Sequence, residues 1–153
     1  MEIKTLKEIA IPSEEKRLQK YFSCYKELVN ELKTKDIETS IVSEINEQID
    51  TINNYTKDYK SLRKYIYKSR NKILKDLEKK HKIVAKNYYR NIWMAIGLAA
   101  FGVPIGIAIS TAIGNIALMG AFFPIGMAIG IAVGISMDKK AEKEGRQLNT
   151  VYN

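Results

Sequence analysis

Residues 91–137 read NIWMAIGLAAFGVPIGIAISTAIGNIALMGAFFPIGMAIGIAVGISM, a stretch of 47 residues that contains no charge and holds eight of the chain's nine glycines. Written as one straight helix, the stretch would be about 70 Å long at about 1.5 Å per residue, whereas bilayer hydrocarbon is about 30 Å thick. The stretch must therefore cross a membrane twice or fold back within it. On this basis we predict an integral membrane protein.

Basic residues flank the stretch on both sides. Lys and Arg next to membrane segments tend to stay on the cytoplasmic side, so the simplest topology is a hairpin with both termini in the cytoplasm. Aromatic residues at the start of the stretch suit the belt that Tyr and Trp form at membrane interfaces. The residues expected at the membrane interface are Lys79, Lys80, Lys82, Lys86, Tyr88, Tyr89, Arg90, Trp93, Lys139 and Lys140.

We place the two crossings at residues 92–112 and 117–136. Gly114 and Asn115 are the expected turn, because both residue types tolerate positive φ angles. Pro104 is expected to kink the first crossing, which neighbouring helices can tolerate in a membrane.

Small residues recur at every fourth position in both crossings, where they let helix backbones approach closely. The second crossing also alternates small and large residues, which places its glycines in one groove and its alanines in another on the nearly opposite face. A helix with two grooves can grip two neighbours, as a closed ring requires. The residues expected to pack helices and copies together are Gly102, Gly106, Ser110, Gly114, Gly126, Gly130, Gly134, Ala128 and Ala132.

Two other arrangements of the stretch remain open. A turn near Phe123 and Pro124 would leave the second crossing too short to span, as a re-entrant segment. The alternation also fits a β-hairpin, although regular glycines weaken strands and one hairpin cannot close a membrane barrel. The motif PIGIAIS at residues 104–110 returns as PIGMAIG at residues 124–130, which favours a duplicated helical unit.

The polar first part of the chain contains neither glycine nor proline between Ser13 and Ile96, which favours long helices. Apolar residues recur at three- and four-residue spacing over residues 18–32 and again over residues 37–88. A first helix of about 20 residues cannot cover a second of about 50, so the stripe from about Tyr59 to Tyr88 would pack on another copy or a partner. The alternative is a break near Asn53 that closes a three-helix bundle.

Charge divides this all-α chain into three parts. Residues 1–90 form the expected N-terminal antiparallel coiled-coil stalk in the cytosol, residues 91–137 the transmembrane hairpin, and residues 138–153 a short polar tail. Residues 61–90 hold 11 Lys and Arg against 2 Asp and Glu, so most of the net charge of +8 forms one basic collar beside the membrane. Such a collar attracts anionic headgroups. Nucleic acid would respond to the same charge, but the collar's position already has a membrane explanation, so we do not expect it as the partner.

The glycine ladders and the repeated PIG motif resemble the glycine-zipper two-helix membrane hairpins of small bacterial proteins. The resemblance covers about residues 92–148 and implies a fold and a tendency to form homo-oligomers. We expect the protein in the bacterial inner (cytoplasmic) membrane. It implies no particular activity. The alternating small residues also look similar to the ring-packed helices of rotary ATPase proteolipid subunits. The essential carboxylate of that family is missing here, so ion translocation by that mechanism is not supported.

No catalytic, cofactor or metal site is expected. His81 lies in a lysine-rich segment without a partner at triad or metal spacing, and we expect it at the surface. The single Cys24 fits a reducing compartment and a helix face.

Two functions that are not enzymatic remain. The first is a membrane effector of the bacterial defence or toxin type, whose copies associate through the stalk, zip their hairpins into a ring and permeabilise the bilayer. The second is a membrane-anchored scaffold or accessory subunit that tethers a cytosolic partner through the stalk. An anchor does not require two ladders of small residues, so we favour the effector. Its weakness is the short supply of polar residues to line a pore, which are Ser110, Thr111, Asn115 and Ser136.

Overall fold

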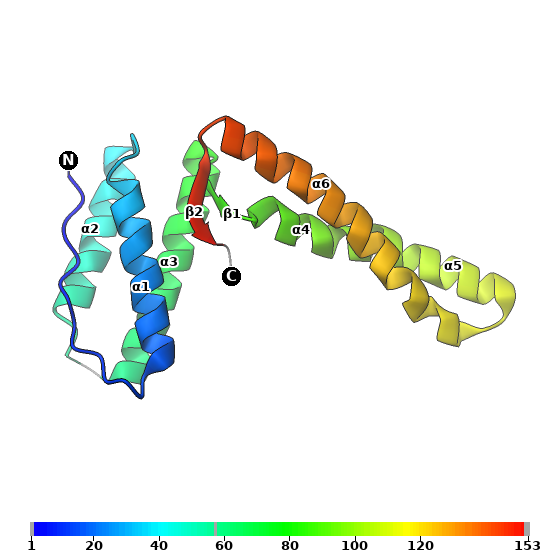
Figure 1. Ribbon diagram of the computed structural model, residues 1–153, viewed down its shortest axis with the longest axis horizontal. Helices are drawn as coiled ribbons and strands as arrows, with labels where there is room; N and C mark the ends of the chain where they lie inside the picture. The colour runs from blue at the N-terminus through cyan, green and yellow to red at the C-terminus, as the bar shows by residue number, and fades with distance from the viewer. Residues whose placement is uncertain (1, 57, 152–153) are drawn as a thin grey trace. The chain divides into compact units, whose positions relative to one another are not determined.

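Helices make up most of the structure, a computed structural model that describes residues 2–56 and 58–151. The chain forms two compact units, a helical bundle (residues 2–84 and 148–150) and a hairpin (residues 85–147 and 151) (Figure 1). The bundle holds α1 (Lys16–Leu32), α2 (Thr39–Asn53) and α3 (Tyr59–His81). The hairpin holds α4 (Tyr88–Gly97), the π-helix η1 (Leu98–Gly102), α5 (Val103–Ile113), the 3₁₀ helix η2 (Ile116–Phe122) and α6 (Phe123–Lys143). Strands β1 (Val84–Lys86) and β2 (Gln147–Val151) pair in a two-stranded sheet, and the chain passes between the units within these strands.

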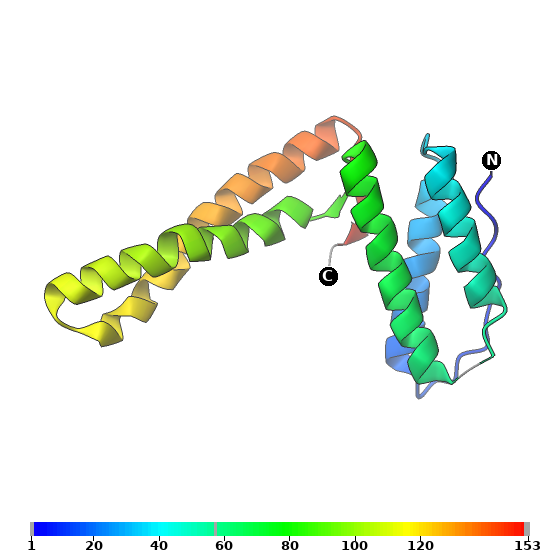
Figure 2. The same ribbon diagram turned by 180° about the vertical axis from the view of Figure 1, so that it is seen from behind.

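The core of the bundle is built from the apolar stripes that the sequence shows. α3 packs against both α1 and α2 (Figure 2). Each helix turns its apolar face inward, as the three- and four-residue spacing requires. The buried apolar side chains are Leu18, Phe22, Tyr25, Leu28, Val29 and Leu32 on α1, Ile41, Val42, Ile45, Ile49 and Ile52 on α2, and Leu62, Ile66, Ile73, Leu74 and Leu77 on α3.

The long second helix that the stripe predicts is interrupted, so the alternative of a three-helix bundle is the one observed. α2 ends at Asn53. The side-chain amide of Asn54 donates to the backbone carbonyl of Asp50 at 2.9 Å, where it competes with the helical backbone bonds. Asp58 then caps α3 by accepting from the N–H of Ser61 at 2.9 Å, and this bond lowers the pKa of the Asp58 carboxyl.

The expected unpartnered stripe beyond Tyr59 is therefore wrong. Leu62, Ile66, Ile73 and Leu77 are between 0 and 3% exposed, because the break folds α3 back along α1 and α2. An antiparallel helical arrangement is present, but its apolar faces are used within one chain. Among the described residues of the bundle, the apolar stripe of α3 is covered by α1 and α2 of the same chain.

An extended segment at the N-terminus lies along α2 and is held by two asparagine side chains. Asn46 accepts from the N–H of Lys4 at 2.7 Å and donates to the carbonyl of Glu2 at 2.9 Å. Asn53 repeats this pattern three residues further along the segment, at 2.8 and 3.2 Å. Seven residues of helix rise about 10.5 Å, and three residues of extended chain span about 10 Å, so the two clamps stay in register. Leu6 is buried between them.

Part of the predicted polar tail also belongs to the bundle. Leu148 is 1% exposed, and the carboxylate of Glu31 accepts from the backbone N–H of Asn149 at 2.8 Å. One apolar side chain among polar neighbours gave no signal of this docking in the sequence.

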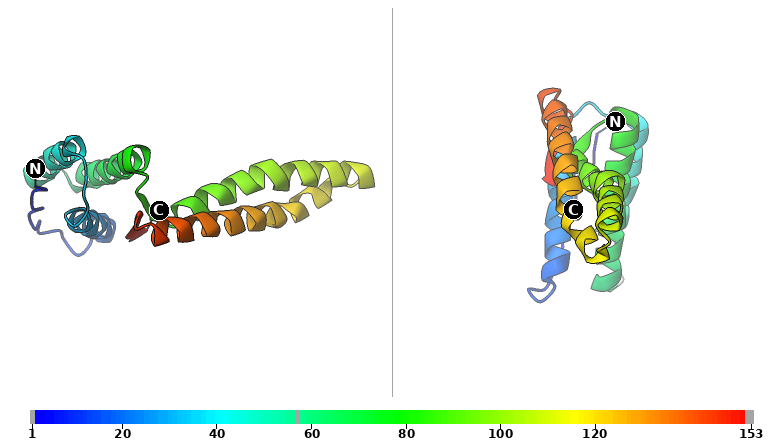
Figure 3. Two further views of the ribbon diagram at one scale, coloured as in Figure 1. Left: turned by 90° about the horizontal axis from the view of Figure 1, so that it is seen from above. Right: turned by 90° about the vertical axis from the view of Figure 1, so that its right-hand side faces the viewer.

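The hairpin turns where the sequence predicts. Gly114 has a φ of +73°, and the side chain of Asn115 accepts from the N–H of Ala117 at 3.1 Å, which starts the second arm. Two helical arms, Tyr88–Ile113 and Ile116–Lys143, lie side by side (Figure 3). Both are long and apolar enough to cross a membrane.

The two alternative arrangements of the stretch are not observed. The chain does not reverse at Phe123 and Pro124, where the 3₁₀ helix η2 instead continues into α6 with Pro124 in its first turn. Proline suits that position because its missing N–H would have had no partner there. The stretch forms helices and not strands, because a helix satisfies every backbone group within its own segment.

Candidate functional site

The two arms of the hairpin meet along a line of very small residues, which we call the glycine seam. Every residue of the seam is buried, although the large apolar residues around it are mostly exposed. The seam consists of Gly97, Gly102, Gly106 and Ser110 on the first arm and Gly126, Gly130 and Gly134 on the second.

The arms touch backbone to backbone at the seam. A Cβ added to Gly126 would lie 2.5 Å from the Cα of Gly102, and one added to Gly106 would lie 2.6 Å from the carbonyl oxygen of Met119. A Cβ on Gly134 would lie 2.7 Å from the carbonyl oxygen of Tyr89. Contacts below 3.0 Å are essentially never seen for real Cβ atoms, so glycine is required at these positions. The ladders predicted to bring copies together therefore pack within one chain.

The π-helix keeps the first arm in register with the second. Gly97 precedes Gly102 by five residues, which would put the two on different faces of a regular α-helix. In η1 the N–H of Val103 donates to the carbonyl of Leu98, five residues earlier, and this wider turn aligns both glycines with α6. Pro104, expected to kink this arm, follows the π turn directly and cannot donate a backbone bond of its own.

Gly97 is a seam residue that sequence reasoning missed. A Cβ on Gly97 would lie 2.7 Å from the Cα of Gly130, which makes it one of the tightest positions in the seam. Gly97 lies five residues before Gly102, so it does not belong to the pattern of small residues at every fourth position. Gly114, counted in the ladder, lies instead in the turn, with nothing within 4 Å of an added Cβ.

The second groove of α6 is open. Ala128, Ala132 and Ser136 are exposed, on the side of the helix away from the seam. Larger exposed side chains stand beside this groove, among them Ile129 and Val133, at 41% and 39% exposure. Of the two grooves that the alternation predicts, one is filled within the chain and one is not.

Asp138 closes the open end of the hairpin. Its side chain is buried, and its two carboxylate oxygens accept from the backbone N–H groups of Tyr89 at 3.1 Å and Arg90 at 3.0 Å. These N–H groups belong to the first turn of α4, where the helix dipole favours a negative charge. Gln147 also donates to the backbone carbonyl of Asp138, at 3.2 Å. The sequence marked Asp138 only as the first charge after the apolar stretch.

The residues predicted at the membrane interface lie in both units. Tyr88 and Tyr89, half-buried at the start of α4, contact each other edge to face with ring centroids 5.2 Å apart, and Trp93 follows one turn later. Arg90 is half-buried beside them. The six predicted lysines are all exposed, and they are Lys79, Lys80, Lys82, Lys86, Lys139 and Lys140.

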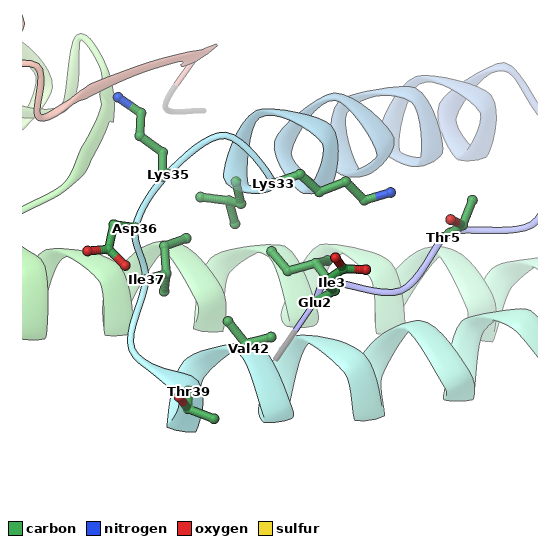
Figure 4. A pocket seen from close by; sticks show the side chains of 10 residues that line it. Glu2, Ile3, Thr5, Lys33, Lys35, Asp36, Ile37, Thr39 and Val42 are labelled. Atoms are coloured by element: carbon green, nitrogen blue, oxygen red, sulfur yellow. The ribbon is translucent and has the colours of Figure 1, made fainter.

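Surface hollows are present among the described residues of the bundle. A groove of about 580 Å³ lies between the N-terminal segment, the loop after α1 and the start of α2, and charges of both signs line it, including Glu2, Lys33 and Asp36 (Figure 4). His81, predicted at the surface, is half-buried at the end of α3, and Cys24 is half-buried on α1. Residues 2–56 and 58–151 contain no group of three or more His, Cys, Asp or Glu side chains that could hold a metal ion.

Comparisons of the chain with protein families, with curated proteins and with solved structures find no match.

Proposed function

We propose that this chain is an integral membrane protein whose hairpins assemble side by side and permeabilise the bilayer, as an effector of the bacterial defence or toxin type. The observation that carries the proposal is the outward apolar surface of both arms. Within the apolar 18-residue segment of each arm, only 17% of the first arm's segment and 11% of the second arm's segment is buried. The core helix of a water-soluble protein would be mostly buried, and an exposed surface of this kind in water would be a large sticky patch. In lipid the same surface is solvated.

The hairpin is suited to lipid in its backbone as well. Both arms are continuous helices, so their backbone groups bond within each arm, as the bilayer interior requires. Basic residues lie before the first arm and after the second. They favour an arrangement with both termini in the cytoplasm of a bacterium and the Gly114 turn across the inner membrane. The resemblance to glycine-zipper hairpins supports the same arrangement.

The open groove on α6 is the assembly face in this proposal. The glycine seam is occupied by the partner arm, so contacts between copies fall to Ala128, Ala132 and Ser136. The first arm also exposes small residues four apart, at Ala108 and Ala112. A groove on one arm that meets the first arm of the next copy makes a head-to-tail contact, and such contacts form a ring when the rotation between copies closes.

The experiment compares Ala132→Leu with the matched control Val133→Leu, which changes an exposed side chain beside the groove without filling it. We expect Ala132→Leu to fill the groove, reduce the oligomer to monomers in detergent and slow dye release from proteoliposomes about tenfold, since close packing is the main attraction between helices in lipid. Val133→Leu should leave both unchanged. Equal oligomer size in the two variants would contradict assembly through this face.

A scaffold or accessory subunit is the second candidate, favoured by the scarcity of polar residues facing outward from the arms. Thr111, Asn115 and Ser136 are exposed, but Ser110 is buried in the seam, where its hydroxyl donates to the carbonyl of Ile107 at 3.1 Å. The bundle, with a core of its own, would serve as the arm to a cytosolic partner. Induced expression that leaves the membrane potential intact while oligomers form would select this function.

A further inference from the structure

Positive charge in the bundle is concentrated on α3. This helix carries nine Lys and Arg against two Asp and Glu, whereas α2 beside it carries three acidic residues and no basic one. Five exposed lysines, separated by four, four, seven and four residues, fall on one arc of α3. This lysine face consists of Lys60, Lys64, Lys68, Lys75 and Lys79.

The lysine face is not neutralised within the bundle. Lys72 forms an ion pair with Glu44, and Lys80 lies 3.7 Å from Glu38. These two acidic residues, on and before α2, thus pair with lysines outside the lysine face. In the described part of the chain, no carboxylate lies within ion-pair distance of the five lysines.

Exposed aromatic side chains accompany the same face. Tyr67, 42% exposed, lies two helical turns after Lys60 and so falls within the face, and Tyr59, 40% exposed, begins the helix. Among the described residues of the bundle, these two are the large apolar side chains that are most exposed. The ring of Tyr67 contacts the ring of Tyr21 edge to face, with 5.7 Å between the centroids. This contact holds the Tyr67 ring in place while part of it remains exposed.

We propose that the lysine face of α3 docks on the anionic surface of the bilayer into which the hairpin inserts. The inference rests on the proposed membrane insertion and adds a surface contact to it. Lysines attract anionic headgroups additively within a Debye length, and tyrosine rings favour the interface between headgroups and hydrocarbon. Residues 82–87, the six between α3 and α4, span at most about 20 Å, so α3 remains tethered to the membrane surface.

The test measures how fast each lysine of the full chain is acetylated by a membrane-impermeant reagent. Proteoliposomes of pure phosphatidylcholine are compared with others that contain about 30% phosphatidylglycerol, at low salt and at about 0.5 M salt. In anionic vesicles at low salt we expect the lysine face to react about threefold more slowly, and Lys16 and Lys33, exposed elsewhere in the bundle, to be unaffected. High salt should abolish the difference.

A matched pair of triple variants separates the face from general charge. Lys64→Gln, Lys68→Gln and Lys75→Gln together should remove the protection of the remaining Lys60 and Lys79. The control removes three exposed cations from α1, as Lys16→Gln, Arg17→Gln and Lys20→Gln, and should leave that protection intact. All six positions are solvent-facing on their helices, so both variants are expected to keep the bundle folded.

Failure of the inference is distinguishable from failure of the proposed function. Chains that resist extraction by alkaline carbonate but react equally in both vesicle types would overturn the lysine face while leaving insertion in place. Chains that carbonate extracts would overturn insertion itself. Protection by single-stranded DNA in detergent, equal to that by anionic vesicles, would assign the face to nucleic acid and also overturn the inference.

Discussion

Tyr25 carries a hydroxyl group that the bundle buries without a bond. The side chain is 0% exposed, and its oxygen has no hydrogen-bond partner among the described residues. Burial, with a smaller contribution from Tyr65, raises the pKa of the Tyr25 hydroxyl. A buried unsatisfied hydroxyl costs stability at every pH, and a raised pKa adds a further dependence at high pH.

We predict that Tyr25→Phe stabilises the bundle by about 1 kcal/mol at neutral pH, because it removes the desolvated hydroxyl and keeps the ring. The folded-state pKa exceeds the unfolded value of about 10, so the wild-type bundle loses stability as the pH rises above about 10, and the variant lacks this loss. Hydrogen exchange of α1 amides measures both effects. Tyr59→Phe, at an exposed hydroxyl, is the control and should change neither.

At the level of single residues, sequence reasoning succeeds where local spacing decides the environment. The stripe residues of α1, such as Leu18 and Leu28, are buried as their period requires. Gly97 and Asp138 were missed because their roles depend on groups about 33 and 49 residues away along the chain, on the opposite arm. No local sequence pattern shows that Gly97 will face the backbone of the other arm or that Asp138 will face the start of α4.

Each arm of the hairpin tolerates methyl groups only outside the seam. We predict that Gly130→Ala destabilises the hairpin by about 1–3 kcal/mol, because the new Cβ would stand 3.1 Å from the Cα of Gly97 and closer still to the Trp93 carbonyl. Gly120→Ala is the matched control, since nothing lies within 4 Å of its Cβ. Unfolding in mixed micelles, followed by Trp93 fluorescence, checks the prediction, and equal midpoints for the two variants would refute it.

The Asp138 clamp makes a second prediction for the hairpin. Asp138→Ala removes both acceptors from the first turn of α4, and we expect a loss of about 1–2 kcal/mol, as for other helix caps. Asp138→Asn keeps one acceptor oxygen, so the stability of its hairpin should lie between that of Asp138→Ala and that of the wild type. Faster exchange of the Tyr89 and Arg90 amides would report the opening, and wild-type exchange in Asp138→Ala would show that the clamp is dispensable.

At the level of elements, the hairpin is predicted more fully than the bundle. The length of the uncharged stretch and the turn at Gly114 define two arms from the sequence alone. The break between α2 and α3 contains neither glycine nor proline, so only Asn54 and Asp58 hint at it. The N-terminal segment has no periodicity, and its place on α2 follows from two asparagines that any sequence analysis would leave at the surface.

For the whole molecule, the basic flanks predict that the bundle and the turn lie on opposite sides of the membrane. In a Cys24→Ala background, an impermeant maleimide added to intact spheroplasts should label Asn115→Cys, whereas Lys16→Cys should react only after lysis. Both positions are exposed, so access depends on the membrane alone. Labelling of Lys16→Cys in intact spheroplasts would reverse the topology.

The wide turn at η1 makes the hairpin sensitive to the length of one arm. It holds one residue more than a regular α-turn, and Ala99 and Ala100 lie inside it. Deleting either alanine would bring Gly97 and Gly102 to a spacing of four, so the arm could relax into uninterrupted α-helix with both glycines still on one face. One further alanine added to this arm would have no second wide turn to absorb it, and it would rotate everything beyond it by about 100° relative to α4. The arms would then lose their common face. The hairpin thus depends on a residue count as much as on residue chemistry.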